Sequence, residues 1–304
     1  MKKVIVVVGP TSVGKTKMGV ELAQSLNGEV ISGDSMQIYK GMDIGTAKVT
    51  HDEMEGVVHH CIDILEPQEE YSVRDFQIQV RALIDDITAR GKLPIIVGGT
   101  GLYIKAALYD YDFSETETQH EFYQQKYKDY DNEALFDYLK TIDPKTCEQL
   151  HPNNRQRVLR AIEIYEETGQ KKSDLEMQQQ HICLYDAYFV GLTLERDVLY
   201  ERINHRVDLM KDQGLEQEVE SLYKQGLTRQ NQSMKAIGYK EWFDYFDALI
   251  DIDEVYENIK KHSRQYAKRQ YTWFRNQFDV HWYDVCLECF DKTVHDVLND
   301  IKKQ

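Results

Sequence analysis

The sequence predicts an α/β fold, with a parallel sheet flanked by helices and an all-helical domain inserted into it. Short apolar runs alternate with helical patterns through the first hundred residues, and this alternation is typical of parallel sheets. A polar segment rich in tyrosine, glutamine and acidic residues then interrupts the pattern, and an apolar run near residue 190 resumes it. We therefore assign residues 1–112 and 186–304 to the core and residues 113–185 to the inserted domain.

Two strands and a helix are predicted at the start of the chain. Residues 4–8 are a continuous apolar, β-branched run, as in strands that are covered on both faces. A glycine-rich turn follows, and the next helix runs to Leu26 because Asn27-Gly28 is a C-terminal signal for helices. Residues 29–32 form the second strand, which leads to Asp34.

The remaining elements follow in order. Ser72, with Asp75 three residues later, resembles a helix N-terminal cap, and apolar residues then recur at helical spacing. Residues 93–97 form a strand that runs into Gly98-Gly99-Thr100-Gly101. Residues 188–194 return to the sheet, and the rest of the chain reads as helices broken at Gly214, Gly226 and Gly238.

The glycine-rich turn matches the phosphate-binding pattern G-x-x-x-x-G-K-[ST]. A strand precedes it and a helix follows, so backbone N–H groups at the positive end of the helix can surround a phosphate. Lys15 adds a full charge, and the Thr16 hydroxyl is placed to hold Mg²⁺. We therefore expect a P-loop NTPase-like core with phosphate contacts from Gly9, Pro10, Thr11, Ser12, Val13, Gly14, Lys15 and Thr16.

The loop does not identify the molecule that carries the phosphate, so ATP binding stays open. A kinase or NTPase would show a second strand that ends in an acid for Mg²⁺. The strand at residues 93–97 leads to glycines instead, whereas Asp34 follows the earlier strand and could serve as that acid. A small-molecule kinase is therefore an alternative, and a non-catalytic, nucleotide-gated RNA-binding protein is a third.

Further motifs extend over nearly the whole chain. They are Asp34-Ser35-x-Gln37-x-Tyr39, Asp43-Ile-Gly-Thr-Ala-Lys48, His59-His60-x-Ile-Asp63, Gly98-Gly-Thr100-Gly-Leu-Tyr103, His151-Pro-Asn-Asn-x-Gln156-Arg157-x-x-Arg160, Arg202-Ile-x-x-Arg206, Ala236-Ile-Gly-Tyr-Lys240 and Tyr266-Ala-Lys-Arg-Gln270. In these residues and their order the sequence resembles the tRNA dimethylallyltransferase (isopentenyltransferase) family. It departs from the family in the variable middle segment and at Val13, where the family usually has a small residue.

The resemblance implies transfer of a dimethylallyl group from dimethylallyl diphosphate to the exocyclic N6 amine of the adenosine 3′ of the anticodon in tRNA. The loop and Mg²⁺ would then hold the diphosphate leaving group. An adenine amine is a poor nucleophile, so a carboxylate must take its proton, and we assign that role to Asp34. Thr100 and Arg206 resemble the donor and the cationic clamp that stabilise the leaving oxygens.

Two basic groups fit a path for tRNA on a chain whose formal net charge is −15. One lies within residues 260–275 among aromatic residues, and the other opens the helix after His151-Pro152; either alone would read as a solvated helix face. Ser35 and Gln37 resemble the family's contacts to the target base, and an amide can pair bidentately with adenine. We expect tRNA contacts from Asp34, Ser35, Met36, Gln37, Thr100, Gln156, Arg157, Arg160, Lys268 and Arg269.

Composition sets further expectations. No apolar run approaches the roughly 18 residues that span a bilayer, so we expect a cytoplasmic protein without a membrane partner. We also expect a monomer. Five cysteines, an odd number, argue against a disulfide framework. Cys286 and Cys289 form one Cys-x-x-Cys between His281 and His295, but no second pair follows at zinc-finger spacing. We predict packed thiols there, with zinc as the alternative.

Overall fold

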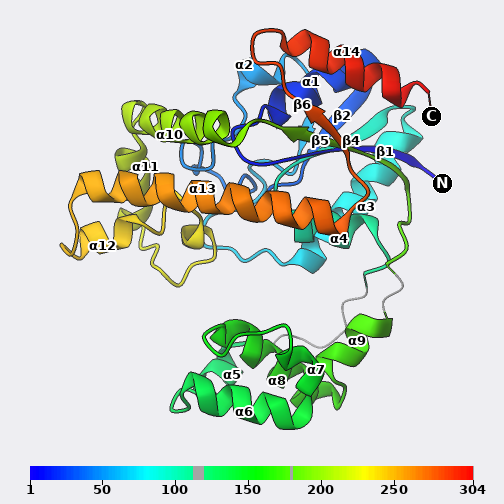
Figure 1. Ribbon diagram of the computed structural model, residues 1–304. Coiled ribbons are helices and arrows are strands. Elements are labelled where there is room, and N and C mark those ends of the chain that lie inside the picture. The colour runs from blue at the N-terminus through cyan, green and yellow to red at the C-terminus, as the bar shows by residue number, and fades with distance from the viewer. Residues whose placement is uncertain (112–119, 179–180, 304) are drawn as a thin grey trace. The chain divides into compact units, whose positions relative to one another are not determined.

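The computed structural model describes residues 1–111, 120–178 and 181–303. The chain divides into two compact units (Figure 1), the first of Met1–Tyr109 with Cys183–Gln304 and the second of Asp110–Ile182. The predicted domain boundary at residues 112 and 113 falls outside the described residues.

The first unit is built on a six-stranded parallel sheet with the order β3-β2-β4-β1-β5-β6. Its central strand pairs with β4 on one side and with β5 on the other, so that Val6 lies between Ile96 and Phe189. This confirms the predicted α/β class. The strands are β1 (Lys3–Val8), β2 (Gly28–Ser32), β3 (His59–His60), β4 (Leu93–Val97), β5 (Asp186–Thr193) and β6 (His281–Asp284).

Helices cover both faces of this sheet. Because side chains alternate along a strand, Val6 packs into one buried cluster and Val7 into another. The Val6 cluster contains residues of α3 (Val73–Ala89), α4 (Gly101–Leu108) and α13 (Ile252–Gln277). The Val7 cluster contains residues of α1 (Lys15–Leu26) and α14 (Phe290–Ile301). Figure 1 shows α1 and α14 on one side of the sheet and α3 and α4 on the other.

The predicted helix signals are present. Ser72 accepts a hydrogen bond from the backbone N–H of Asp75, whose carboxylate accepts the N–H of Ser72 in return, as in a capping box. Gly214, with φ of 95°, ends one helix and opens the next. The first unit also contains α2 (His51–Met54), α10 (Arg196–Gln213), α11 (Leu215–Lys224), a 3-10 turn (Ser233–Lys235) and α12 (Trp242–Phe246).

Every regular element described in the second unit is a helix. Its core is formed by Leu135, Leu139, Val158 and Ile162. Asp143 caps α7 and also accepts the N–H and hydroxyl of Ser173 on α9, which ties two helices together. The helices are α5 (His120–Lys126), α6 (Asn132–Ile142), α7 (Pro144–Cys147), α8 (Arg155–Thr168) and α9 (Lys172–Gln178).

Two features near the C-terminus differ from the prediction. The sequence was expected to be helical to its end, but β6 adds a strand at the edge of the sheet. Cys286 and Cys289 form a disulfide, so the prediction of packed thiols is wrong for this pair. Within the described ranges no group of three or more His, Cys, Asp or Glu residues could hold a metal ion. None of the helices described is both long and apolar enough for a membrane span.

Candidate active site

Three turns meet at the carboxyl ends of the central strands. They are the P-loop (residues 9–16) after β1, the turn at residues 33–37 after β2, and the turn at residues 98–101 after β4. The N–H of Gly33 donates to the carbonyl oxygen of Val97 at 2.8 Å, and the N–H of Thr100 donates to the carbonyl oxygen of Gly33 at 3.2 Å. Because ligands bind at this edge of parallel sheets, the turns mark the site.

Two helices far along the chain hold the P-loop in place. The N–H of Thr11 donates to Oε1 of Gln270 on α13 at 2.9 Å, and Nε2 of Gln270 donates to the carbonyl oxygen of Gly99 at 3.1 Å. From α10, Nε of Arg202 donates to the carbonyl oxygen of Ser12 at 3.0 Å. Gln270 therefore links the P-loop to the turn after β4.

Two cations lie at the P-loop. Nζ of Lys15 donates to the carbonyl oxygen of Pro10 at 2.7 Å. Burial, and then the charge of Arg206, lowers the pKa of Lys15 to about 7, while the charge of Asp34 opposes the shift. Burial also lowers the pKa of Arg206, against the opposing charge of Asp34.

Neither cation forms an ion pair with any residue that the structure describes. Among the described residues, the guanidinium of Arg206 hydrogen-bonds to two neutral oxygens, with Nη1 at 3.4 Å from Oγ1 of Thr11 and Nη2 at 3.3 Å from the carbonyl oxygen of Ala47. Buried charge without a partner is costly. A bound anion, such as a diphosphate, would supply the missing partner.

Asp34 lies beside these cations. Its Oδ1 accepts the N–H of Met36 at 2.8 Å, which fixes the carboxylate in its own turn. No hydrogen bond from the described residues reaches Oδ2. Oγ1 of Thr100 accepts the N–H of Ser35 at 3.2 Å. The structure thus brings Asp34, Thr100 and Arg206 together around the P-loop.

A cavity of about 320 Å³ is lined by Asp34 and Arg206, whereas Thr100 does not line it. Its predicted members are Thr11, Ser12, Asp34, Ser35, Met36, Arg206 and Arg269. Its other polar members, Thr46, Lys235, Lys240, Ser263 and Tyr266, had no role predicted from the sequence, although four of them stand in quoted motifs or next to one. Its apolar wall is formed by Ile203, Val207, Met210, Ala236 and Ile237.

Tyr266 illustrates the electrostatics of this cavity. Burial, and then the charge of Asp34, raises the pKa of Tyr266 to about 12. Its hydroxyl donates to the carbonyl oxygen of Gly99 at 3.3 Å, and its ring lies 5.6 Å from the guanidinium of Arg269. A neutral phenol and an exposed arginine therefore form one rim of the cavity.

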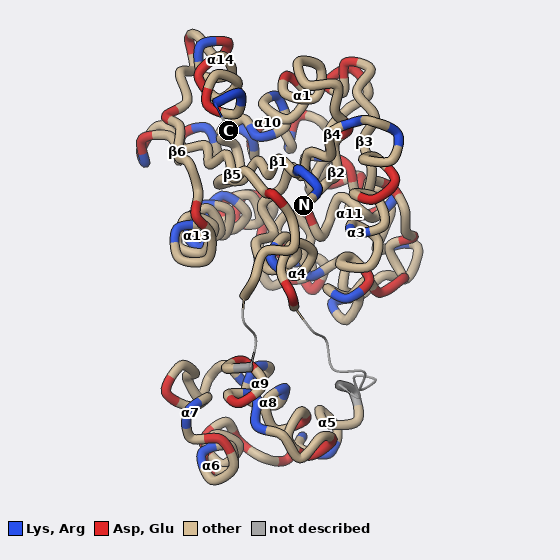
Figure 2. The backbone as a smooth tube through the Cα atoms, turned by 90° about the vertical axis from the view of Figure 1, so that its right-hand side faces the viewer, with Lys and Arg blue, Asp and Glu red and all other residues tan. Residues whose placement is uncertain are grey.

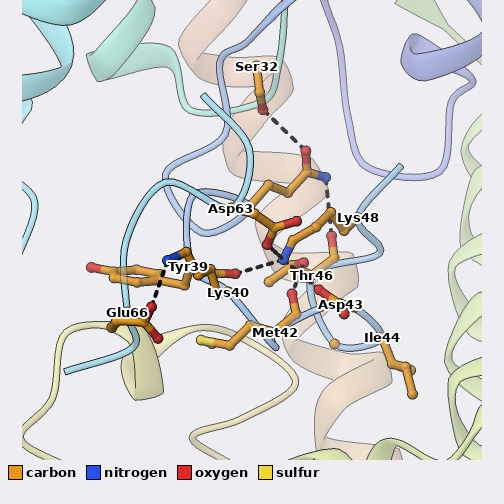
Figure 3. A network of polar contacts seen from close by, with 12 residues as sticks. Ser32, Tyr39, Lys40, Met42, Asp43, Ile44, Thr46, Lys48, Asp63 and Glu66 are labelled. Carbon is orange, nitrogen blue, oxygen red and sulfur yellow. Dashed lines mark hydrogen bonds and ion pairs between the residues drawn. The ribbon is translucent and has the colours of Figure 1, made fainter. Parts of the chain in front are cut away.

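Several predicted site residues of the first unit do not line the cavity: Gly9, Pro10, Val13, Gly14, Lys15, Thr16, Gln37, Thr100 and Lys268. The amide of Gln37 is used inside its own loop, since Oε1 accepts from the Ser32 hydroxyl at 3.2 Å and Nε2 donates to the carbonyl oxygens of Thr46 and Ala47 at 3.4 and 3.3 Å (Figure 3). Thr16, in the first turn of α1, and Lys268, on α13, are exposed and do not line the cavity.

Two basic residues of α13 that the sequence placed on a path for tRNA have partners within the protein. Lys260 pairs with Asp208 of α10 at 2.8 Å, and Nη1 of Arg264 donates to Oδ1 of Asn204 on the same helix. Lys268 and Arg269 remain exposed. Figure 2 shows blue Lys and Arg positions on α13 and red acidic positions on many other elements. Charge alone in this segment therefore does not identify a nucleic-acid contact.

The second basic group lies on α8 in the second unit. Gln156 and Arg157 are exposed there, while Arg160 pairs with Glu163 at 2.9 Å. Arg155 donates to the carbonyl oxygens of Tyr127 and Tyr130, so it holds the helices of its own unit together.

The fold and the cavity define a P-loop-type core in which two basic side chains, Lys15 and Arg206, lie beside the carboxylate of Asp34. Two family models match the chain, one described as IPP transferase over residues 37–277 and one described as isopentenyl transferase over residues 2–65. The chain belongs to the IPP transferase family.

Curated relatives agree over nearly the full length. The tRNA dimethylallyltransferase of Anoxybacillus flavithermus is 52% identical over 99% of this chain and 96% of its own length. That of Geobacillus thermodenitrificans is 56% identical over 93% of this chain and 91% of its own length.

Solved structures agree as well. A tRNA isopentenylpyrophosphate transferase from Staphylococcus epidermidis is 45% identical, with a TM-score of 0.74 and 100% of both chains covered. A eukaryotic dimethylallyltransferase acting on tRNA is 31% identical, with a TM-score of 0.86 over 100% of this chain and 80% of that one.

Proposed function

We propose that the chain transfers a dimethylallyl group from dimethylallyl diphosphate to the N6 amine of the adenosine adjacent to the 3′ side of the anticodon in tRNA. The observation that carries this proposal is that Lys15 and Arg206, two cations without an ion pair among the described residues, lie beside the carboxylate of Asp34. Relatives that share half of the sequence or more are tRNA dimethylallyltransferases. This favours a prenyl transferase over the small-molecule kinase.

In the proposed reaction one bond breaks and one forms. The allylic carbon–oxygen bond opens and its electrons leave with the diphosphate, while the adenine nitrogen bonds to the allylic carbon. The nitrogen loses one proton, which Asp34 accepts. Charge grows on the departing oxygens, so Lys15, Arg206 and the P-loop N–H groups stabilise that state more than the ground state. Thr100, held against Ser35, keeps the turn next to Asp34 in place.

Magnesium fits the oxygen donors at this site. Mg²⁺ prefers oxygen ligands and is commonly held by one or two protein groups together with substrate phosphates. The hydroxyl of Thr16, in the first turn of α1, would be such a protein donor, and the diphosphate would supply the other oxygens. When bound, the ion would neutralise charge on the diphosphate.

The tRNA contacts are proposed from exposure and charge. Arg269 lines the cavity, and Lys268 next to it is exposed. On α8, Gln156 and Arg157 are exposed, and Arg160 lies one turn away. We assign these residues to the anticodon stem and loop, from which a single base can be turned out. The monomeric state stays a prediction.

The test is direct. Unmodified tRNA, dimethylallyl diphosphate and Mg²⁺ are incubated with the protein, and the nucleosides are analysed by mass spectrometry. We expect an adenosine that carries one dimethylallyl group, and none when ATP replaces the diphosphate donor. Failure to form that nucleoside with all components present would overturn the proposal.

A further inference from the structure

The loop of residues 43–48 forms one wall of the cavity through Gly45, Thr46 and Ala47. We propose that Glu218 is a positioning residue: its carboxylate fixes the 43–48 loop and, through this loop, directs Arg206 at the diphosphate. The inference rests on the proposed function, because it assumes that the cavity binds a diphosphate. Glu218 lies on α11 and contributes no atom to the cavity.

The carboxylate of Glu218 accepts hydrogen bonds from three successive backbone amides. Its Oε2 accepts the N–H groups of Asp43 and Ile44 at 2.9 and 2.8 Å, and its Oε1 accepts the N–H of Gly45 at 3.1 Å. The hydroxyl of Tyr239 donates to the same Oε1 at 2.6 Å. Bonds to a charged acceptor are roughly twice as strong as those between neutral groups. One carboxylate therefore determines the backbone course of this end of the loop.

Tyr239 adds a steric restraint at the same place. Its side chain is fully buried, and its ring lies so close to Gly45 that a Cβ atom there would be 2.5 Å from a ring carbon. Real Cβ atoms do not approach that closely. The loop thus lies against the ring on one side and is bonded to the acid at its amides.

The other end of the loop is braced by Lys48. Its Nζ donates to the carbonyl oxygen of Tyr39 at 2.7 Å and pairs with Asp43 and Asp63 at 2.5 Å, and its side chain is only 5% exposed. Figure 3 shows the lysine between these groups, with Thr46 and Met42 nearby. The N–H of Ala47 donates to the carbonyl oxygen of Ile44 at 2.9 Å, so a shift at residues 43–45 moves Ala47 as well.

Ala47 delivers that shift to the site. Its carbonyl oxygen accepts Nη2 of Arg206 at 3.3 Å, and the other contact of the guanidinium is Oγ1 of Thr11 at 3.4 Å. These neutral contacts orient a cation that has no ion pair among the described residues. Glu218, which does not touch Arg206, therefore governs the direction of its guanidinium.

The experiment compares Glu218→Gln with Glu220→Gln. Glu220 lies on the same helix and pairs only with Lys224 in the described structure, at 2.8 Å, so its change is chemically matched. For Glu218→Gln we expect kcat to fall about tenfold, part of the 10²–10³-fold that loss of one oxyanion donor costs, with KM for tRNA within twofold. The Glu220→Gln variant should equal the wild type. Equal activities of the two variants would overturn the proposal.

A double variant separates positioning from a structural role. If Glu218 acts through Arg206, Glu218→Gln should cost little more kcat in an Arg206→Lys protein, because coupled residues are not additive. A full additional tenfold loss would overturn the proposal. Should Glu218→Gln not fold, Tyr239→Phe removes one donor to the carboxylate and keeps the ring, and the same coupling is measured with it.

A binding measurement does not depend on prenyl transfer. Titration calorimetry with inorganic diphosphate and Mg²⁺ should give an affinity about fivefold weaker than that of the wild type for Glu218→Gln. The affinity of Glu220→Gln should be unchanged. If the wild type makes no prenylated nucleoside, the proposed function fails, and this titration still tests the role of Glu218. Unchanged diphosphate affinity in Glu218→Gln overturns the positioning role.

Discussion

Strand β2 has a carboxylate at each end, and the two have opposite surroundings. Glu29, at its start, has a side chain only 3% exposed and contacts three basic side chains: Arg90 at 2.5 Å, Lys92 at 2.8 Å and His60 at 2.8 Å. Asp34, just past its end, lies near Lys15 and Arg206 but pairs with neither in the described structure.

The difference separates a structural charge from a functional one. Hydrogen bonds from Arg90 hold the pKa of Glu29 well below its ordinary range, against the opposing effect of burial. The carboxylate of Glu29 therefore has its charged partners within the protein. Near Asp34, at the other end of β2, Lys15 and Arg206 have no ion pair among the described residues. This raises the energy of the free site and favours an anionic ligand. Three substitutions test this contrast, in order of their expected effect on transfer.

Asp34→Asn should have the largest effect on turnover and almost none on stability. The amide keeps an oxygen for the N–H of Met36 but cannot accept the proton of the adenine amine. We expect kcat to fall 10²–10⁴-fold, the usual share of a general base, with tRNA affinity within about threefold and an unchanged melting temperature. Near-normal turnover, or a loss explained by unfolding, would make Asp34 a structural charge like Glu29.

Lys15→Arg should change how diphosphate binding depends on pH. Since the pKa of Lys15 is lowered to about 7, the free protein loses this proton as pH rises through 7, and a bound diphosphate restores it. Affinity for inorganic diphosphate should therefore fall between pH 7 and pH 9, by at most about tenfold per pH unit for one proton.

Arginine stays charged over this range, so the variant should show a shallower fall and less proton uptake. Calorimetry in two buffers of different ionisation enthalpy counts the protons, and the comparison of the two proteins removes the titration of diphosphate itself. The same pKa shift affects folding. Because the pKa of Lys15 is lower in the folded than in the unfolded protein, the stability of the free protein rises with pH above 7. Equal proton uptake in both proteins would contradict the assignment.

Glu29→Gln should leave kcat within twofold and lower the free energy of unfolding by about 1–3 kcal/mol, because buried bonds to charged groups are lost. The depressed pKa gives stability that is present above the ordinary glutamate pKa of about 4.3 and is lost as pH falls below it. Urea titrations of both proteins should therefore begin to approach each other below about pH 4, and they should coincide only as pH nears the strongly lowered pKa of folded Glu29. A variant with normal stability and reduced turnover would contradict the contrast.

Sequence pattern predicted the parts of the molecule that depend on neighbours in the chain. The strand, glycine turn and helix around Lys15 are contiguous, and so is the cap formed by Ser72 and Asp75. Strand β6 was missed because only four residues, His281–Asp284, pair at the sheet edge. They are half-buried or exposed, so they lack the apolar run that marked the central strands.

Contacts across the chain could not be predicted in this way. Gln270 bonds to Thr11 across 259 positions, and Glu218 bonds to Asp43 across 175. A helical repeat placed Lys260 and Arg264 on one face, but it could not show that α10 supplies their partners. The resemblance named Asp34, Thr100 and Arg206, and only the folded chain shows how the P-loop, α10 and α13 bring them together.

The close approach of Gly33 and Gly98 limits how this enzyme can move. A Cβ atom on Gly98 would lie 2.3 Å from the backbone of Gly33, and Gly33 bonds to Val97 and Thr100 on either side. The turn that bears Asp34 and the turn that bears Thr100 thus form one rigid unit. Because Gln270 and Tyr266 also tie α13 to the turn after β4, an opening that admits substrate would come from α10 and the 43–48 loop, while the proton acceptor stays in place.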